Sequence, residues 1–422
     1  LSYVNFIISI LFMACYAYQA VYLVAALLKK QKVFKAKKLH RYGVLIAARN
    51  EEAVIAQLIR SVRAQKYPEE LIDIFVVADN CTDNTAQAAR EAGAVVYERH
   101  NTYAVGKGYA LRFLLENIFK NFGEYAYDGF FVFDADNVLD CHFVEAMNRT
   151  FTDGYEVVTS YRNSKNYGEN WISAGYALWF IRESRYLNNS RMLMGTSCAI
   201  SGTGFMISNK IVQKYGGWKF HLLTEDIEFS ANSILEGIRI AYTPTAVLYD
   251  EQPITFRDSW NQRFRWAKGF YQVFFTYGKH LVKSTFRYHR FAAYDMFMTI
   301  APGMLLSLIL MLANATFLIV GGLSHGFLAT EVEMQACAAS LIMTFAMMYL
   351  TFFILALLTT IFEYKHIHCP QKWRLVTNLF TFPIFMFSYI PITVAALFLK
   401  VDWVPTQHAV SVTLDEVMQG AK

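Results

Sequence analysis

The sequence has few cysteines, and none of them has the close spacing that metal sites and disulfide frameworks require. The six cysteines are scattered along the chain: Cys15, Cys81, Cys141, Cys198, Cys337 and Cys369. No two of them form a CxxC motif, which argues against a zinc site and against a disulfide framework. We therefore expect reduced thiols with a structural role.

Charged residues are also scarce, at 17% of the chain, and the formal net charge is only +5. The basic residues are not interleaved with aromatic residues as on nucleic-acid-binding surfaces, so we expect no nucleic-acid partner. We find no internal repeat and no low-complexity segment. By contrast, 55% of the 422 residues are hydrophobic. The chain is therefore more apolar than a typical soluble protein, and too long for one ordinary domain.

Residues 1–28 form an almost wholly apolar run without a charged side chain. This run is long enough to cross a bilayer as a helix, which takes about 20 residues. Basic residues follow it directly: Lys29, Lys30, Lys32, Lys35, Lys37, Lys38 and Arg41. Positive charge after the run, and none before it, predicts a plasma-membrane anchor with the next segment in the cytoplasm. A cleaved signal peptide would carry its charge first and have a shorter apolar core.

Residues 291–399 contain further apolar runs, which predict three transmembrane helices at 296–320, 336–361 and 375–399. The loop 321–335 has no Lys or Arg, whereas the next loop carries Lys365, Lys372 and Arg374. This asymmetry predicts an external first loop and a cytoplasmic second loop. Pro383 and Pro391 leave a re-entrant last run open, and with it the side of the membrane on which the tail, residues 400–422, lies.

The segment 41–250 has the alternating pattern of a soluble α/β domain. Short apolar runs predict strands at 43–48, 72–78, 94–97 and 130–133. Helical segments separate these strands, one of them at about 108–120. The alternation predicts a parallel sheet with helices on both faces. Ligands of such sheets bind at the carboxyl ends of the strands.

Two carboxylates, Asp134 and Asp136, stand directly after the most apolar of these strands. Residues i and i+2 of a strand point to the same side, so the two side chains can converge on one point. Convergent carboxylates at the carboxyl end of a buried strand suit a hard divalent cation, which in turn suits phosphate oxygens. The alternative is a polar turn, in which Asp is common.

Two other residues fit the same end of the sheet. Asp79 follows the second strand, where an acidic residue can bind ribose hydroxyls or a base edge. Lys107 lies between Gly106 and Gly108, and a lysine with flanking glycines can approach a phosphate closely. The alternatives are a turn or helix cap for Asp79, and an exposed lysine at a helix start for Lys107.

The sequence Thr224-Glu225-Asp226 begins a predicted helix. Thr224 can cap the helix and the acids favour its first turn, which is one complete explanation. The functional interpretation makes Asp226 a general base that takes a proton from an attacking hydroxyl. Upstream, Gly202 and Gly204 offer backbone against which a bulky ligand could press.

A basic and aromatic segment, residues 251–290, predicts amphipathic helices at the membrane surface. Within it, Gln262, Arg265 and Trp266 have i, i+3 and i+4 spacing and share one helix face. Arg265 can grip a diphosphate, and Trp266 can stack on a sugar. The alternative is interfacial anchoring, which we favour for Arg263 and Lys268.

Together, these four motifs resemble those of family 2 glycosyltransferases of the membrane-bound, polysaccharide-synthase type. In that family they are written D, DxD, TED and QxxRW, and here they are Asp79, Asp134-Ala135-Asp136, Thr224-Glu225-Asp226 and Gln262-Arg263-Phe264-Arg265-Trp266. The resemblance implies a cytoplasmic α/β domain of the GT-A fold beside an α-helical transmembrane region. It also implies a nucleotide-diphosphate sugar donor such as a UDP-sugar, Mg²⁺ or Mn²⁺, and inversion at the anomeric carbon.

The resemblance also suggests a role for each residue. Asp79 would contact the nucleoside, Asp136 with Asp134 the metal, and Arg265 with Trp266 the diphosphate and the acceptor. Asp226, beside Glu225, would be the base. A single in-line displacement needs no enzyme nucleophile, which agrees with the lack of a Ser/His/Asp or Cys/His constellation.

Three classes of function remain open at this point. The leading hypothesis is a processive synthase that elongates a β-linked polysaccharide and exports it through the bilayer, as a single subunit or a homo-oligomer. The second is transfer of one sugar to a lipid-linked acceptor. The third, a transporter or structural membrane protein, is disfavoured because the apolar runs contain no internal Lys or Arg.

Overall fold

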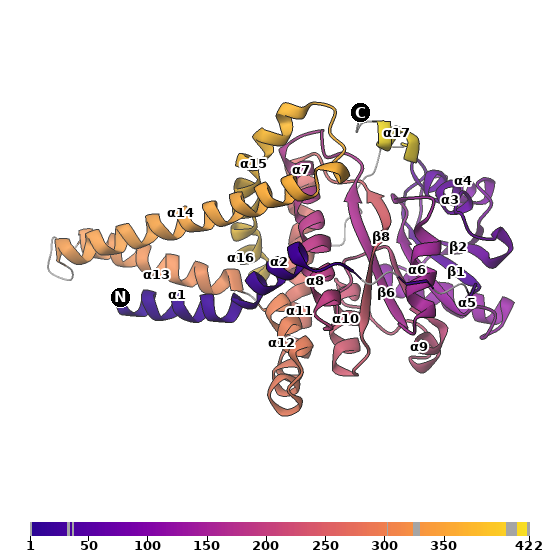
Figure 1. The fold of residues 1–422 in the computed structure, drawn as a ribbon, viewed down its shortest axis with the longest axis horizontal. Helices are drawn as coiled ribbons and strands as arrows, with labels where there is room; N and C mark the ends of the chain where they lie inside the picture. The colour runs from indigo at the N-terminus through magenta and orange to yellow at the C-terminus, as the bar shows by residue number, and fades with distance from the viewer. Residues whose placement is uncertain are drawn as a thin grey trace.

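The computed structural model describes residues 2–31, 34–35, 38–301, 303–323, 330–401 and 412–419. Figure 1 shows an α/β domain from which long helices, including α1 (Ser2–Tyr16), α13 (Gly303–Leu323) and α14 (Glu331–Phe362), project to one side. Helix α14 packs against both α1 and α13. The chain therefore consists of an α/β domain and an apolar helical region.

The domain is built on one eight-stranded sheet with the order β3-β2-β1-β4-β7-β6-β8-β5. The strands are β1 Tyr42–Ala48, β2 Ile72–Asp79, β3 Val95–Arg99, β4 Gly129–Asp134, β5 Val138–Leu139, β6 Val157–Ser164, β7 Phe205–Ser208 and β8 Ile240–Asp250. Strands β3, β2, β1 and β4 are parallel, as are β6 and β8. Strand β7 runs antiparallel to both β4 and β6.

The predicted α/β class is confirmed, but the prediction of a wholly parallel sheet is wrong. The four strands predicted from the sequence are β1 to β4, which are parallel to one another. Strand β7 enters the sheet between β4 and β6 in the opposite direction, after a turn in which Gly202 and Gly204 have positive φ angles of 78° and 66°. The inversion leaves β6 and β8 pointing the same way as β4, so their carboxyl ends lie at the same edge of the sheet.

Helices cover both faces of the sheet, because alternate strand residues point to opposite sides. The helices of the domain are α3 Ile55–Arg63, α4 Thr85–Glu91, α5 Lys107–Phe122, α6 Phe143–Thr152, α7 Trp171–Arg182, α8 Asn189–Leu193, α9 Asn209–Lys214 and α10 Glu225–Leu235. In β1, Leu45 packs with Leu111 of α5 on one face. Its neighbours Val44 and Ile46 pack with Leu58 of α3 on the other face. A π-helical turn, Glu183–Asn188, joins α7 to α8.

Three helices of the described chain are long and apolar enough to cross a membrane: Asn5–Leu28, Glu331–Phe362 and Lys372–Phe398. The first comprises α1 and α2 (Tyr18–Leu28), and the last comprises α15 (Lys372–Phe387) and α16 (Tyr389–Phe398). The predicted run 296–320 is divided, because Met296 lies in the separate helix α12 (Phe291–Ile300) and packs on the domain. Parts of the predicted external loop (324–329) and of the tail (402–411 and 420–422) lie outside the described residues.

The predicted amphipathic segment forms one long helix, α11 (Phe256–Tyr288), that joins the domain to the apolar helices. Arg263 is fully buried in it and donates to Phe385 O at 3.2 Å and Ser388 Oγ at 2.6 Å, at the joint of α15 and α16. Lys268 donates to Ala396 O near the end of α16 at 3.0 Å. Both residues therefore contact groups inside the protein, on the candidate span α15–α16, and their role at a membrane surface stays a prediction.

A buried ion pair fixes helix α2 to the domain. Arg191 of α8 donates to both carboxylate oxygens of Asp295 in α12, at 2.8 and 2.9 Å. The hydroxyl of Tyr22 in α2 donates to the same carboxylate at 2.7 Å. Arg191 and Asp295 are only 3% and 1% exposed. Neither charge has access to bulk water, so each depends on the other.

We expect Asp295→Asn to destabilise the protein by about 3–5 kcal/mol, because it leaves the Arg191 guanidinium buried without a counter-charge. Thermal unfolding in detergent would measure this loss. Arg112→Ala, which breaks the exposed pair with Glu116, serves as the control and should cost less than about 1 kcal/mol. Equal effects of the two substitutions would contradict a structural role for the buried pair.

Candidate active site

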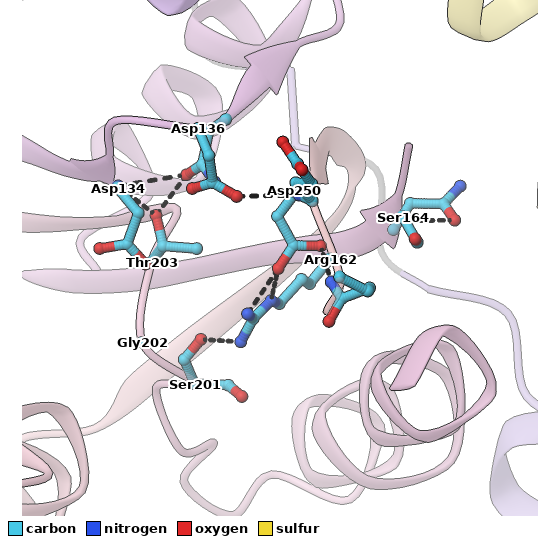
Figure 2. Close-up of polar contacts among 12 residues, drawn as sticks. Asp134, Asp136, Arg162, Ser164, Ser201, Gly202, Thr203 and Asp250 are labelled. Atoms are coloured by element: carbon cyan, nitrogen blue, oxygen red, sulfur yellow. Dashed lines mark hydrogen bonds and ion pairs between the residues drawn. The ribbon is translucent and has the colours of Figure 1, made fainter. Parts of the chain in front are cut away.

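The predicted site residues gather at the edge of the sheet where parallel strands end. Asp79 ends β2, Asp134 ends β4 and Asp250 ends β8. Figure 2 shows Asp134, Asp136 and Asp250 close together, with the loop that contains Ser201, Gly202 and Thr203 beside them. This is the place where α/β sheets bind their ligands.

Hydrogen bonds to neighbouring loops and to the next side chain, Asn137, hold Asp134 and Asp136 in place. The Asp134 backbone N–H donates to Thr203 Oγ1 at 2.9 Å. Asp136 accepts from the Glu251 backbone N–H at 2.8 Å and from the Asn137 side chain at 3.2 Å. These contacts fix the loop after β4, and each carboxylate oxygen has a second lone pair that can serve a cation.

The carboxylate pair has the chemistry of a Mg²⁺ or Mn²⁺ site, since these ions prefer oxygen ligands. In the part of the chain that the structure describes, no group of three His, Cys, Asp or Glu side chains has the arrangement of a metal cage. Mg²⁺ is typically bound by one or two carboxylates, with waters and substrate phosphates completing its shell. The residues present therefore fit a cation that arrives with a phosphorylated ligand.

Asp250 is a third carboxylate at this edge that the sequence analysis missed. Arg162 of β6 pairs with it, with Nε and Nη2 at 2.6 and 2.5 Å from Oδ2. Burial is the main cause that raises the pKa of Asp250 to about 6, against the effect of Arg162. Its position could have indicated this residue in the sequence, because β8 ends in an acidic residue just as β2 and β4 do.

Lys107 joins the metal-binding loop to the Gly202 loop. Its ammonium lies 2.5 Å from Asp134 Oδ1 and donates to Gly202 O at 2.8 Å. The prediction that the flanking glycines let the backbone approach a phosphate is wrong for Gly108. A Cβ on Gly108 would lie 2.0 Å from Phe220 O, so this glycine allows α5 to pack closely rather than exposing backbone to a phosphate.

The acids of the Thr224-Glu225-Asp226 motif begin helix α10 and point to the same place. Asp226 Oδ2 accepts from the Gly202 backbone N–H at 2.6 Å. Burial raises the pKa of Asp226, and it raises that of Glu225 to about 7 although Lys107 opposes the shift. Both carboxyls are thus biased toward proton uptake, as a general base requires.

The capping role considered for Thr224 is wrong, because its side chain makes no capping hydrogen bond in α10. It packs instead against Gly269 of α11, where a Cβ would lie 2.5 Å from its methyl group. The motif therefore joins the start of α10 to α11.

The two glycines after Ser201 have different roles. A Cβ on Gly204 would lie 1.8 Å from the Leu248 side chain, so packing of the sheet explains this glycine without a ligand. Gly202 has a left-handed conformation and bonds through both its N–H and its C=O to the predicted site. Of the two predictions, only Gly202 is placed among the site residues.

Helix α11 brings an arginine to the carboxylates. Burial lowers the pKa of Arg265, and the opposing charges are Glu225, Asp134 and Asp226. Trp266 packs edge-on against Tyr176 and Phe180, with ring centroids 5.8 and 6.0 Å away. The Gln262 Oε1 atom is buried without a hydrogen-bond partner. Gln262, Arg265 and Trp266 all lie on the single helix α11, as the predicted common face requires, and this helix borders the site.

Asp79 lies beside an open cleft of about 450 Å³, lined by Asn80, Cys81, Thr82, His100, Asn101, Thr102 and Tyr103. Its carboxylate pairs with Arg99 at 2.5 Å, and Arg99 also donates to Ala104 O at 2.6 Å. These contacts connect the two loops that form the cleft. Asp79 thus shapes this cleft, and its direct contact with a nucleoside stays a prediction.

Comparison with known proteins identifies the family. Residues 40–269, more than half of the chain, match the family described as "Glycosyltransferase like family 2". The chain belongs to this glycosyltransferase family. The match confirms the predicted resemblance, the enzyme class and the GT-A-like α/β fold, and it includes all four motifs.

The curated relatives of this glycosyltransferase have names that describe different activities. A probable glycosyltransferase, YdaM, of Bacillus subtilis is 28% identical over 55% of this chain and 56% of its own length. A β-monoglucosyldiacylglycerol synthase of Nostoc is 27% identical over 57% of this chain and 51% of its own. A poly-β-1,6-N-acetyl-D-glucosamine synthase of Staphylococcus aureus is 26% identical, with 58% of each chain covered. The chain thus spans about half the length of these relatives.

Among solved structures, the glycosyltransferase is similar to a mannosyltransferase of Pyrobaculum calidifontis in complex with GDP-Man and Mn²⁺. The two share 16% sequence identity and superimpose with a TM-score of 0.48, over 80% of this chain and 98% of that one. The family assignment itself depends on the sequence match over residues 40–269.

The buried carboxyls predict a stability that depends on pH. Because folding raises the pKa of Glu225 to about 7, the folded protein binds a proton that the unfolded chain releases. In chelator-treated protein, the free energy of unfolding should therefore fall as pH rises from about 4.5 to about 7, on the order of 1–3 kcal/mol. Melting temperatures across this range, in detergent, would measure the slope.

Glu225→Gln should flatten this pH dependence, since the amide has no proton to lose. Glu116→Gln changes an exposed glutamate and should leave the slope as in the wild type. If Glu225→Gln kept the wild-type slope, the shift would belong to another group.

Proposed function

We propose that this glycosyltransferase transfers a sugar from a nucleotide-diphosphate sugar, with a divalent metal and with inversion at the anomeric carbon. One observation supports the proposal: Lys107 and Asp226 meet at the peptide of Gly202, Lys107 also pairs with Asp134, and the charges of the same carboxylates act on Arg265 of α11. Such a set contains what an in-line sugar transfer needs, namely charge neutralisation for the departing diphosphate and a base for the acceptor.

The donor diphosphate would lie between the cation site at Asp136 and the cations of Lys107 and Arg265. A bound Mg²⁺ or Mn²⁺ would supply a Lewis acid that neutralises the departing diphosphate. Arg265 offers hydrogen-bond donors in a fixed planar fork, which suits phosphate oxygens. Because these groups are buried, their electrostatic effect on developing charge is larger than it would be in water.

Asp226 would take the proton from the attacking hydroxyl of the acceptor. The Gly202 N–H holds one of its carboxylate oxygens at 2.6 Å, which fixes the orientation of the group, and the acceptor would approach the other oxygen. A single displacement at the anomeric carbon inverts the configuration and leaves no covalent enzyme intermediate. The motif arginine and tryptophan of α11 would border the acceptor.

The acceptor we favour is a growing β-linked polysaccharide at the membrane, with Asp226 and Trp266 facing its end. The poly-N-acetylglucosamine synthase among the relatives supports this choice. So do the candidate spans and the contacts of α11 with α16, because a product formed beside α11 forms next to the apolar helices. We place the α/β domain in the cytoplasm, since the basic residues follow the first span.

Transfer of one sugar to a membrane lipid is the second candidate. It is favoured by the relative named for diacylglycerol glucosylation. It is also favoured by the number of candidate spans, three in the described part of the chain, which is few for a polymer channel within one subunit. A homo-oligomer would offer the polymer a larger channel.

A turnover assay on membranes with labelled UDP-sugars and GDP-mannose, and with Mn²⁺ or Mg²⁺, tests the proposal. Asp226→Asn should lower turnover by about 10²–10⁴-fold, since it removes the base, while donor binding persists. A high-molecular-weight product would identify a polymer synthase, and a solvent-extractable single-sugar product a lipid glycosyltransferase. Asp153→Asn, at the exposed end of α6, is the control. Unchanged turnover in Asp226→Asn would rule out this base.

The metal is tested by calorimetry of nucleotide binding. We expect Asp136→Ala to abolish the Mn²⁺-dependent part of UDP or GDP affinity, because one of the two carboxylate ligands is lost. Asp153→Ala should bind as the wild type does. An affinity that neither the substitution nor a chelator changes would argue against a metal at this site.

A further inference from the structure

Lys165 is a buried cation that the proposed mechanism has not used. It follows β6 directly, and its backbone N–H donates to Asp250 O at 2.8 Å. The residue is only 9% exposed, and its Nζ atom has no hydrogen-bond partner in the described structure. A buried ammonium without a partner costs free energy, so its presence calls for an explanation.

Two other cations of the site, Lys107 and Arg162, differ from Lys165 in this respect. Lys107 is paired with Asp134, and Arg162 with Asp250. Arg162 therefore neutralises a carboxylate that would otherwise be buried with an unbalanced charge, and Lys107 neutralises one that is partly exposed. The Lys165 ammonium lies outside these pairs, so it is available to a ligand.

The surroundings of Lys165 place it beside the metal-binding loop. Burial lowers its pKa, and the opposing influences are Asp136 first, followed by Glu251, Asp250 and Glu51. These carboxylates follow the strands β4, β8 and β1. The Asp250–Glu251 peptide connects Lys165 to Asp136: its C=O accepts from the Lys165 N–H at 2.8 Å, and its N–H donates to Asp136 at 2.8 Å. Lys165 thus lies at the edge of the sheet where Asp134 and Asp136 would hold a cation, and it is buried there.

A divalent cation at Asp136 changes what Lys165 can bind. The cation would occupy the carboxylate that now exerts the largest favourable influence on the ammonium, and two positive groups would then lie near each other. An anionic ligand that contacts both removes the repulsion. The diphosphate of a nucleotide-sugar donor is such a ligand, since the proposed function already places it on the cation.

We infer that Lys165 is a donor-binding residue, whose ammonium donates to a diphosphate oxygen of the nucleotide sugar beside the metal. The inference rests on the proposed function and adds a contact to it. It also explains why the free side chain is buried, because a ligand oxygen supplies the missing partner. A charge-assisted hydrogen bond of this kind contributes about 10- to 100-fold to affinity.

The test is calorimetry of the full-length protein in detergent with Mn²⁺, using UDP and GDP as probes and uridine and guanosine as phosphate-free controls. Lys165→Met should weaken binding of the preferred diphosphate by about 10- to 100-fold and leave binding of its nucleoside unchanged. Lys165→Arg, which keeps a cation, should restore most of the affinity. Lys210→Met, at a lysine whose side chain is 81% exposed, is the matched control.

A melting curve of each ligand-free variant distinguishes binding from structure. Lys165→Met should unfold at the wild-type temperature or above it, because a buried unpaired charge has been removed. A lower melting temperature with equal loss of nucleoside and diphosphate affinity would overturn the inference in favour of a structural lysine. If Lys165→Met does not fold, Lys165→Gln replaces it in the same comparison.

The outcomes separate this inference from the proposed function. If the wild type binds neither UDP nor GDP, both the proposed function and the role of Lys165 are refuted. If the wild type binds a diphosphate and Lys165→Met binds it equally well, only the role of Lys165 is refuted. If the diphosphate alone is weakened, the side chain contacts its phosphates.

Discussion

The peptide of Gly202 is the connection on which the site depends. Its N–H holds Asp226, the candidate base, and its C=O holds Lys107, which pairs with Asp134 of the cation site. The next residue, Thr203, accepts from the backbone of Asp134. A short loop between α8 and β7 therefore fixes the distance between the parts that would bind the donor and the part that would activate the acceptor. A change in this loop would affect both together.

Much of the site could be predicted from sequence, because its residues stand in short motifs at the ends of apolar strands. Asp134, Asp226 and Arg265 are examples, and the structure brings their motifs together. The roles of single residues were harder to predict. Thr224 suggested a helix cap and Gly204 a ligand contact, yet close packing against α11 and β8 explains them. Such packing depends on residues that are far away in the chain.

Long-range ion pairs were beyond prediction for the same reason. Arg162 and Asp250 are 88 positions apart, and neither belongs to a motif with a known spacing. Lys165 looks like an ordinary polar residue in sequence, and only its burial without a partner distinguishes it. The inverted strand β7 is a similar case, because its direction depends on its pairing with β4 and β6, which the short run Phe205–Ser208 does not reveal. Arg263 looked interfacial because its sequence neighbours are aromatic, whereas the rings that surround it, Tyr176, Phe385 and Tyr389, come from α7, α15 and α16.

The length of α14 has a consequence for where the domain lies relative to the bilayer. Its 32 residues correspond to about 48 Å at about 1.5 Å per residue, whereas a hydrocarbon core is about 30 Å thick. Glu363, at its end, accepts from Tyr161 of β6 at 2.8 Å and pairs with Arg185 at 3.1 Å. As a membrane span, this helix would be about 18 Å longer than the core, so that Glu363 and the part of β6 that it contacts would lie in the headgroup layer or beyond it. A sugar added there would enter the polar boundary of the lipid at the depth where its hydroxyls are still hydrated.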